Sequence, residues 1–144
     1  YGRILTDDLE YADRAKTLSA KTYDVSEYLH QANLPLTAKQ PSQAIAWHPP
    51  CSLQHGQKIT GVVEELLEGA GYNLVPVADS HLCCGSAGTY SVLQYERSQA
   101  LRQLKLDSLL EADPEVIVTA NVGCQSHLAA GTSRPVLHWI EMLK

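Results

Sequence analysis

Short apolar runs alternate with helix-like stretches along most of the chain, and this alternation limits the possible folds more than any other feature. Residues 44–47 form the first run, and residues 53–68 then place apolar side chains at the three- and four-residue spacing of a helix face. Residues 73–77 and 91–111 repeat this order of strand and helix. Such alternation is typical of an α/β fold with a mostly parallel sheet and flanking helices.

The rest of the chain continues in the same order. Residues 116–119 read Val-Ile-Val-Thr, and a fully β-branched run predicts a strand that is buried on both faces. A short helix is expected over residues 124–130. A fourth apolar run at residues 136–137 then leads into a final helical turn over residues 139–143.

The beginning of the chain has a different character. Residues 6–31 have a helical pattern that opens with Thr6 and two acidic residues, which predicts an N-cap. Asp24 and Glu27 have the spacing of a capping box and predict that a second helix starts there. Residues 33–42 contain two prolines and little periodicity, so they predict a linker.

These features divide the chain into two expected parts. Residues 1–42 are predicted to be a helical connector, and residues 43–144 are predicted to be one cysteine-rich domain. The chain opens with Tyr1 rather than an initiator Met. We therefore expect it to be a fragment of a longer protein.

The composition excludes several functional classes. Hydrophobic residues make up 44% of the 144 residues, which is ordinary for a globular protein, and the formal net charge is −5. Acidic and basic residues are interspersed, without the basic surface that nucleic-acid binding requires. No apolar run has the roughly 18 residues of a membrane span, and no signal-peptide pattern is visible. We therefore expect a cytoplasmic protein.

Each of the four cysteines comes just after a predicted strand. Cys51 follows the first strand, Cys83 and Cys84 follow the second, and Cys124 follows the third. The carboxyl ends of parallel strands share one edge of a sheet, so the loops there are expected to bring the four thiols together. Adjacent cysteines rarely form a disulfide with each other. This pattern therefore favours an intracellular metal or redox site over a disulfide framework.

Glycines and a histidine accompany the thiols. Gly85 and Gly88 belong to a loop of small residues that is expected to open a helix, and Gly123 precedes the last cysteine. At such positions backbone N–H groups can approach sulfur closely and favour thiolates, so these glycines are candidate cofactor-binding residues. His127 lies one helical turn after Cys124 and is a candidate metal ligand. Thiolates with an imidazole suit either an iron–sulfur cluster or zinc.

Other residues near the cysteines have simpler interpretations. His48 precedes two prolines and is expected to be structural or to support a ligand, whereas His55, one helical turn after Cys51, is a weaker candidate to face the site. Lys105 is expected on the solvated face of its helix. Thiol catalysis by one of the two adjacent cysteines ranks last among the possible functions, because a lone nucleophile does not need four convergent cysteines.

The cysteine motifs resemble those of the cysteine-rich CCG domain family. The resemblance spans residues 44–144 and rests on His48-Pro49-Pro50-Cys51, on Cys83-Cys84-Gly85 and on Asn121-Val122-Gly123-Cys124. Domains of this family occur, usually in two copies, in heterodisulfide reductase, lactate-utilisation, glycerol-3-phosphate dehydrogenase and glycolate dehydrogenase subunits. The amino-acid sequence around the second and third motifs is most similar to the iron–sulfur subunits of glycolate dehydrogenase, also called glycolate oxidase.

The resemblance implies an electron-transfer subunit of an oxidoreductase complex. Electrons would come from a flavin-containing subunit and pass toward a quinone or another membrane acceptor, at the inner face of the cell membrane. The chain would have no catalytic residues of its own, and residues 1–42 would connect it to a preceding repeat. A zinc-stabilised structural or assembly module without redox activity is the alternative.

One departure from the family pattern concerns the last motif. The family motif ends Cys-x-x-Cys, whereas this chain has Cys124-Gln125-Ser126-His127. Relatives with a non-cubane 4Fe-4S cluster use five thiolates per domain. With four here, the resemblance implies that His127 supplies the fifth contact, that the cluster is an ordinary cubane, or that the site is degenerate.

Overall fold

The computed structural model describes residues 2–144 and divides them into two compact units, residues 2–34 and residues 35–144. The first unit contains α1 (Ala12–Ala20) and α2 (Val25–Ala32). The predicted capping box is confirmed, because Asp24 accepts from Ser26 and Glu27 accepts from the Asp24 backbone N–H. The predicted start at Thr6 is wrong: the Asp8 carboxylate accepts from the backbone of residues 10 and 11, and regular helix follows only after this turn.

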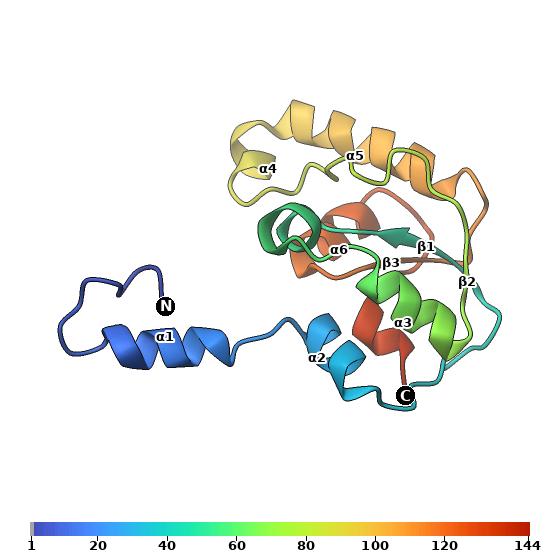
Figure 1. The fold of residues 1–144 in the computed structure, drawn as a ribbon. Coiled ribbons are helices and arrows are strands. Elements are labelled where there is room, and N and C mark those ends of the chain that lie inside the picture. Colours follow the sequence, from blue (N-terminus) through green and yellow to red (C-terminus); the bar gives the residue numbers. More distant parts are fainter. Residues whose placement is uncertain (1) are drawn as a thin grey trace. The chain divides into compact units, whose positions relative to one another are not determined.

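The second unit is built on a four-stranded parallel sheet (Figure 1). Its strands are β1 (Ala44–His48), β2 (Asn73–Leu74), β3 (Val116–Thr119) and β4 (Val136–His138), in the spatial order β2-β1-β3-β4. All three pairings are parallel. The predicted α/β class with a parallel sheet is therefore confirmed.

The helices lie on both faces of this sheet. In Figure 1, α3 (Val62–Ala70) lies on one side, and α5 (Tyr95–Leu110) and α6 (Val122–Ala129) lie on the other. The chain leaves β1 toward β2 and later crosses back over β1 to reach β3. The connection after β1 and the connection after β3 leave in opposite directions and lie on opposite faces of the sheet. Such an arrangement leaves a crevice at the carboxyl ends of these two strands.

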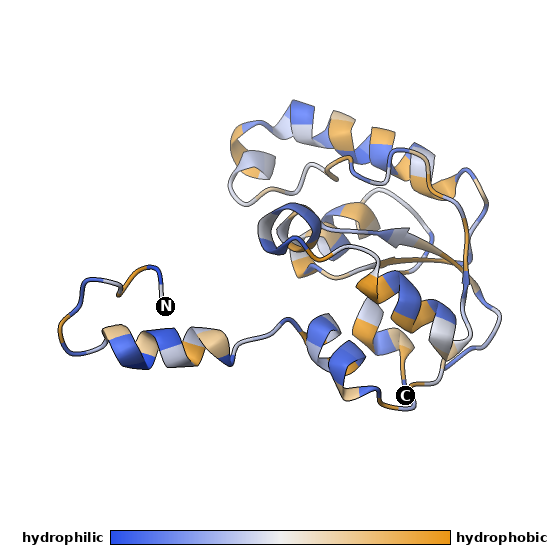
Figure 2. Cartoon of the chain, viewed as in Figure 1, coloured by the Kyte–Doolittle hydropathy of each residue, from blue (hydrophilic) through white to orange (hydrophobic). Residues whose placement is uncertain are grey.

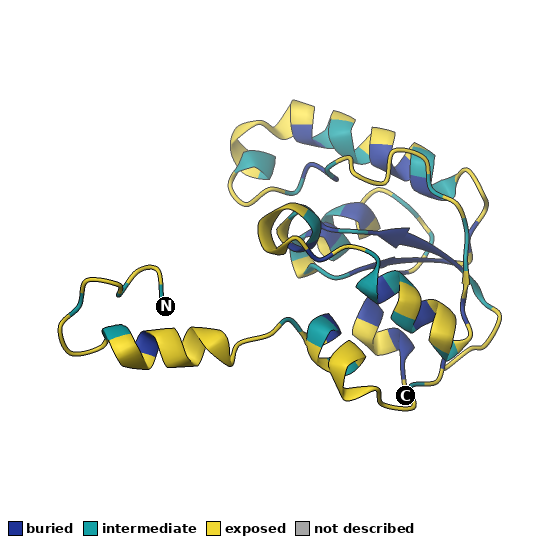
Figure 3. Cartoon of the chain, viewed as in Figure 1, coloured by how far each residue is buried: buried dark blue, intermediate teal, exposed yellow. Residues whose placement is uncertain are grey.

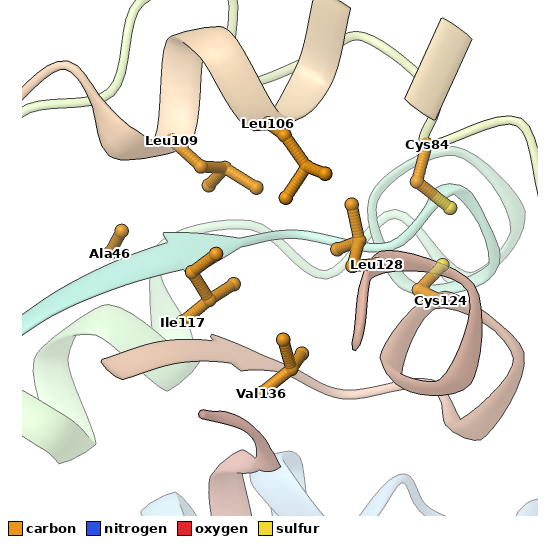
Figure 4. Close-up of a cluster of buried hydrophobic side chains, with 8 residues drawn as sticks. All are labelled: Ala46, Cys84, Leu106, Leu109, Ile117, Cys124, Leu128 and Val136. Carbon is orange, nitrogen blue, oxygen red and sulfur yellow. The ribbon is translucent and has the colours of Figure 1, made fainter. Parts of the chain in front are cut away.

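The central strands lie in the middle of the buried core. β3 is buried along its whole length, as predicted, and β1 and β3 are coloured as buried in Figure 3. Ile117 packs with Leu109 of α5 and Leu128 of α6 in one cluster, drawn in Figure 4. On the other face, α3 has the mixed hydropathy of an amphipathic helix (Figure 2) and buries Val63 and Leu67.

Two predicted helices are interrupted in the structure. The stretch 53–68 forms two elements, a π-helical segment, η1 (Ser52–Gln57), and then α3. The helix is broken between these elements because Lys58 and Gly61 adopt positive φ angles of 63° and 81°. The stretch 91–111 becomes α4 (Tyr90–Leu93) and α5, separated at Gln94, whose φ of −124° and ψ of 49° are not helical.

The ends of the second unit are closed by short segments. β2 is shorter than the predicted run 73–77, which is consistent with Pro76 lacking an N–H for the ladder. The final turn is a 3₁₀ helix, η2 (Trp139–Met142). Ala38 forms an antiparallel bridge with Leu143, so residues 35–42 pack with this unit.

The helices of residues 2–144 do not have the properties of a membrane span. None of them combines the length and the apolar character needed to cross a bilayer.

Two leucines of α5 allow a matched test of the packing. We expect Leu109→Ala to lower the free energy of unfolding by about 2–5 kcal/mol, because Leu109 is fully buried and its removal leaves a cavity. Leu104→Ala is the control on the same helix, since Leu104 is 59% exposed, and should change stability by less than about 0.5 kcal/mol. Urea unfolding measures both, and equal losses in the two variants would contradict this packing.

Candidate metal centre

The cysteines are positioned by three turns at the carboxyl edge of the sheet. Cys51 precedes η1 just after β1, and Cys124 lies in the first turn of α6, just after β3. Cys83 and Cys84 lie in the loop between β2 and α4. This is the edge at which ligands gather in parallel sheets.

A single cavity of about 740 Å³ brings these thiols together. Its lining includes all four cysteines, and His127 lies in the same wall. Of the three candidate glycines, two also line the cavity, Gly88 and Gly123. Residues far apart in the sequence therefore share one concave site of the size typical of ligand pockets.

The four thiols differ in burial. Cys84 and Cys124 are 1% and 8% exposed, and Figure 4 shows their sulfur atoms facing each other at one end of the apolar cluster. Cys51 and Cys83 are only partly buried. No disulfide links the four cysteines, so all of them are free thiols in this structure.

The pKa values of the two buried thiols are shifted in opposite directions, which favours one shared proton near neutral pH. The Cys124 thiol donates to the Cys84 sulfur, and this hydrogen bond lowers the pKa of Cys84 to about 4, although burial opposes the shift. The same hydrogen bond, followed by burial, raises the pKa of Cys124. Burial, followed by the nearby Cys83, raises the pKa of Cys51. Cys51 and Cys83 also contribute to the shift at Cys124, so all four sulfurs interact electrostatically.

Backbone amides of the Cys-Cys-Gly loop point at sulfur. The Gly85 N–H donates to the Cys83 Sγ over 3.3 Å. The backbone of Ser86 donates to Cys84 and helps to lower the pKa of that thiol. Such N–H groups stabilise negative charge on sulfur, which is the chemistry expected of a ligand loop.

Gly85 is required by its surroundings rather than by a ligand. It is buried with a φ of 89°, and a Cβ atom there would lie 2.5 Å from the Ser98 carbonyl oxygen of α5. Ser98 Oγ in turn donates to the Gly85 carbonyl over 2.8 Å. Ser98, for which no sequence motif indicates a role, thus fixes the cysteine loop against α5.

The other two glycines have different environments. A Cβ atom at Gly123 would lie 2.9 Å from Ser86 Oγ, so its absence lets the cysteine loop approach the start of α6. Gly88 has a φ of 53° and open space around it. Asn121 caps α6 by accepting from the N–H groups of Gly123 and Cys124 at 2.9 and 3.2 Å.

The expectation that the cysteine loop opens a helix is wrong. The next helix, α4, begins at Tyr90 and is only four residues long, so Cys83 and Cys84 lie in irregular loop well before it. The loop amides, rather than a helix terminus, provide the positive partial charge near these sulfurs.

His48 lies closer to the sulfurs than its sequence position suggested. One ring nitrogen of His48 and the sulfurs of Cys84 and Cys124 all lie within 4.8 Å of one another. The side chain is 0% exposed, and neither ring nitrogen meets the geometry of a hydrogen bond among the described residues, although the imidazole is close enough to Cys84 to help lower the pKa of that thiol. The signal in the sequence was its place at the end of a buried strand, three residues before Cys51.

His127 has a different environment in the wall of the cavity. Its Nε2 lies 3.2 Å from Ser98 Oγ and 3.4 Å from the Ser98 carbonyl oxygen. Two further histidines that border cysteine motifs in the sequence, His55 and His81, are exposed and do not line the cavity.

Lys105 corrects a prediction. It was expected on a solvated face, but it is 0% exposed and its Nζ donates to the carbonyls of Asp79 and Ser80 at 3.1 and 3.0 Å. Burial lowers the pKa of Lys105, and the negative groups of Asp79 and Cys84 oppose this shift. The lysine therefore fixes the segment before Cys83 and places a buried cation near the sulfurs.

The donor set fits a thiophilic metal centre. Four free thiols line one cavity, the pKa shifts of the buried pair favour a thiolate at Cys84, and backbone N–H groups favour its negative charge. The orphaned ring nitrogens of His48 beside that pair are an independent sign, because buried polar atoms rarely lack a partner. Sulfur and imidazole are the ligands of iron–sulfur clusters and of zinc.

The chain is similar in sequence to a known domain family and to known proteins. Residues 45–129 match the family model of the cysteine-rich domain called CCG. The chain is 44% identical over 144 residues to the glycolate oxidase iron-sulfur subunit of Escherichia coli (strain K12), covering all of this chain and 35% of that protein.

The chain is also similar to more distant relatives. The chain is 31% identical over 142 residues to a probable glycolate oxidase iron-sulfur subunit of Bacillus subtilis (strain 168), covering 93% of this chain and 31% of that protein. It is 30% identical over 152 residues to lactate utilization protein A of an Exiguobacterium species, covering 99% of this chain and 61% of that protein. The chain thus spans about a third of the two glycolate oxidase relatives.

Gly85 allows a test of how the cysteine loop is held. We expect Gly85→Ala to combine the strain of a positive φ, about 1–3 kcal/mol, with a collision against Ser98 that costs a similar amount again. Gly61→Ala is the control, because Gly61 has a φ of 81° and nothing within 4 Å of the methyl group that alanine would add, so only the first cost applies. If urea unfolding gave the same loss for both variants, the close approach of the loop to α5 would be disproved.

The shared proton predicts a pH dependence in the reduced, metal-free protein. The depressed pKa of Cys84 means that the folded pair holds one proton between about pH 4 and pH 9, whereas the unfolded pair holds two. Folding therefore releases a proton, and the free energy of unfolding rises with pH by up to about 1.4 kcal/mol per pH unit. This contribution is present at pH 8 and is lost as the pH falls toward 4.

Urea unfolding between pH 5 and pH 8 measures this dependence. The difference in slope between the wild-type protein and Cys84→Ser measures the contribution of Cys84 together with that of Cys124, Cys51 and Lys105, whose pKa values Cys84 shifts. A Cys84→Ser variant with the wild-type slope would show that the two thiols do not share a proton.

Proposed function

Because this chain belongs to the CCG family of cysteine-rich domains, we propose that it is the iron–sulfur, electron-transferring part of a larger oxidoreductase that acts on glycolate or a similar 2-hydroxy acid. The observation that carries this proposal is the meeting of four free thiols in one cavity at the carboxyl edge of the sheet. The names of the relatives support it, since they include two glycolate oxidase iron-sulfur subunits and a lactate utilization protein.

The proposed ligands are the cavity thiols. Cys51, Cys83, Cys84 and Cys124 would hold the group, with His127 as a candidate further contact from its place in the cavity wall. A bound 4Fe-4S cluster, cubane or non-cubane, would supply one-electron oxidation and reduction. The glycines of the two ligand loops would let backbone amides and sulfur approach closely.

The protein's own residues would set the properties of the centre. The amides of Gly85 and Ser86 donate to sulfur, and the buried cation of Lys105 lies near the same sulfurs. Each of these favours negative charge at the site and would raise its reduction potential. The burial of Cys84 and Cys124 against the apolar cluster would keep water from the inner side.

We further propose how the chain works within its complex. A flavin-containing subunit would oxidise the hydroxy acid, and this chain would pass the electrons on toward a quinone or another membrane acceptor. The chain itself would have no turnover of substrate. The complex would be cytoplasmic and peripheral to the inner face of the membrane, with residues 1–42 leading from a preceding repeat.

Zinc is the second candidate, and one observation favours it. Three donors, from His48, Cys84 and Cys124, lie within 4.8 Å of one another, which suits a single tetrahedral ion. Under this alternative the domain would be a structural or assembly module without redox activity, and chelation would unfold it.

Anaerobic loading of the 144-residue chain with iron and sulfide separates the candidates. We expect a brown protein with equal amounts of iron and acid-labile sulfide, broad visible absorption and an electron paramagnetic resonance signal after one-electron reduction. Cys84→Ser should lose most of the iron, because it removes a buried thiolate, whereas Ser126→Ala, in the same cavity wall, should keep it.

Elemental analysis of the same samples gives the opposing result. A colourless protein that holds one zinc ion per chain, and takes up no iron and sulfide under anaerobic loading, would reject the electron-transfer proposal in favour of the zinc module.

A further inference from the structure

We propose that His48 is a direct ligand of the metal centre and supplies its nitrogen donor, in place of His127. The ligand would be a ring nitrogen of His48, on the buried side of the site next to Cys84 and Cys124. This inference rests on the proposed function, since it requires that the cavity holds a metal group.

The position of the imidazole favours ligation. His48 is the last residue of β1, and it is paired in register with Thr119 of β3 at the centre of the sheet. One of its ring nitrogens lies within 4.8 Å of both buried sulfurs, which also lie within 4.8 Å of each other. Three donors at such mutual distances can bind one metal ion, because bonds of about 2.0–2.3 Å allow separations of this order after a small adjustment.

Unsatisfied buried polar atoms gather at the same place. Some buried side-chain nitrogen and oxygen atoms in residues 2–144 have no hydrogen-bond partner. Two neighbours, His48 and Thr119, carry all but one of these atoms. They are both ring nitrogens of His48 and the Oγ1 of Thr119. Both side chains are 0% exposed, so water does not satisfy these atoms from the surface.

Metal ligation would give one ring nitrogen of His48 a partner and leave the other as a hydrogen-bond donor. A neutral imidazole has one donor and one acceptor nitrogen. If His48 only donated to a thiolate, its acceptor nitrogen would need the Thr119 O–H as a donor, and these two groups do not form a hydrogen bond in this structure. If the acceptor nitrogen binds the metal, the remaining N–H is free for a hydroxyl oxygen, as is usual for ligating histidines.

Thr119 is the residue available for that second contact. Paired residues on neighbouring parallel strands are about 4.8 Å apart and project to the same face of the sheet. We infer that, once a metal binds the first ring nitrogen, the Thr119 Oγ1 accepts from the second, a hydrogen bond that this structure does not contain, and thereby orients the His48 ring toward the sulfurs. Thr119 is therefore a positioning residue.

His127, by contrast, already has polar neighbours. Its Nε2 is within hydrogen-bond distance of Ser98 Oγ, and the ring is only partly buried. Binding a metal through this nitrogen would break the contact with Ser98, whose hydroxyl also holds the cysteine loop through the Gly85 carbonyl. His48 can bind without any such loss.

Pulsed electron paramagnetic resonance on the 144-residue chain tests this inference. The protein is labelled with ¹⁵N-histidine, loaded anaerobically with iron and sulfide, and reduced. Iron and sulfide contents are measured first, because a protein that takes up neither fails the proposed function itself. For a loaded protein, a directly bound imidazole gives a strong coupling to ¹⁵N that a distant histidine does not give.

We expect this coupling in the wild-type protein, its persistence in His127→Gln, and its loss in His48→Gln. Thr119→Val should keep the coupling but shift its magnitude, because it removes the acceptor that orients the ring. A loaded wild-type protein without the coupling, or a coupling lost in His127→Gln and kept in His48→Gln, would overturn the inference.

A variant that does not fold leaves the test intact. If circular dichroism shows that His48→Gln is unfolded, the His127→Gln protein decides the question. A coupling retained in that protein supports His48 as the donor, and a coupling lost there rejects it.

Discussion

The parallel pairing of β1 with β3 is the constraint on which the rest of the structure depends. It aligns His48 with Thr119 at the carboxyl ends of the two central strands, so the turns that follow begin side by side. Those turns carry Cys51 and Cys124, and the loop after β2 adds the two adjacent cysteines at the same edge. A shift of one residue in this register would turn the His48 side chain to the opposite face.

The site places polar groups in positions where apolar side chains could otherwise pack. The buried sulfurs of Cys84 and Cys124 belong to the apolar cluster around Ile117, and a buried lysine and a buried histidine lie near them. Polar groups of this kind destabilise a fold unless something pairs with them. Their concentration at one edge of the sheet, where the cavity lies, is the pattern expected where stability is given up for binding.

Much of the fold could be predicted from the sequence, because strand and helix periodicities are local. The β-branched run that became β3 and the capping box at Asp24 are examples. The meeting of the cysteines follows from one rule about parallel sheets, given that each cysteine follows a strand. Lys105 and His48 could not be placed in this way, because their burial depends on which loop covers them, and a single sequence does not encode that in a local pattern.

The central claim is that four thiolates from three separate turns hold one iron–sulfur group. Iron K-edge X-ray absorption of the anaerobically loaded chain measures this most directly, because it reports the atoms bound to iron and the neighbouring metals. We predict a first shell dominated by sulfur, together with iron–iron scattering. A first shell of oxygen and nitrogen without iron–iron scattering would contradict the claim.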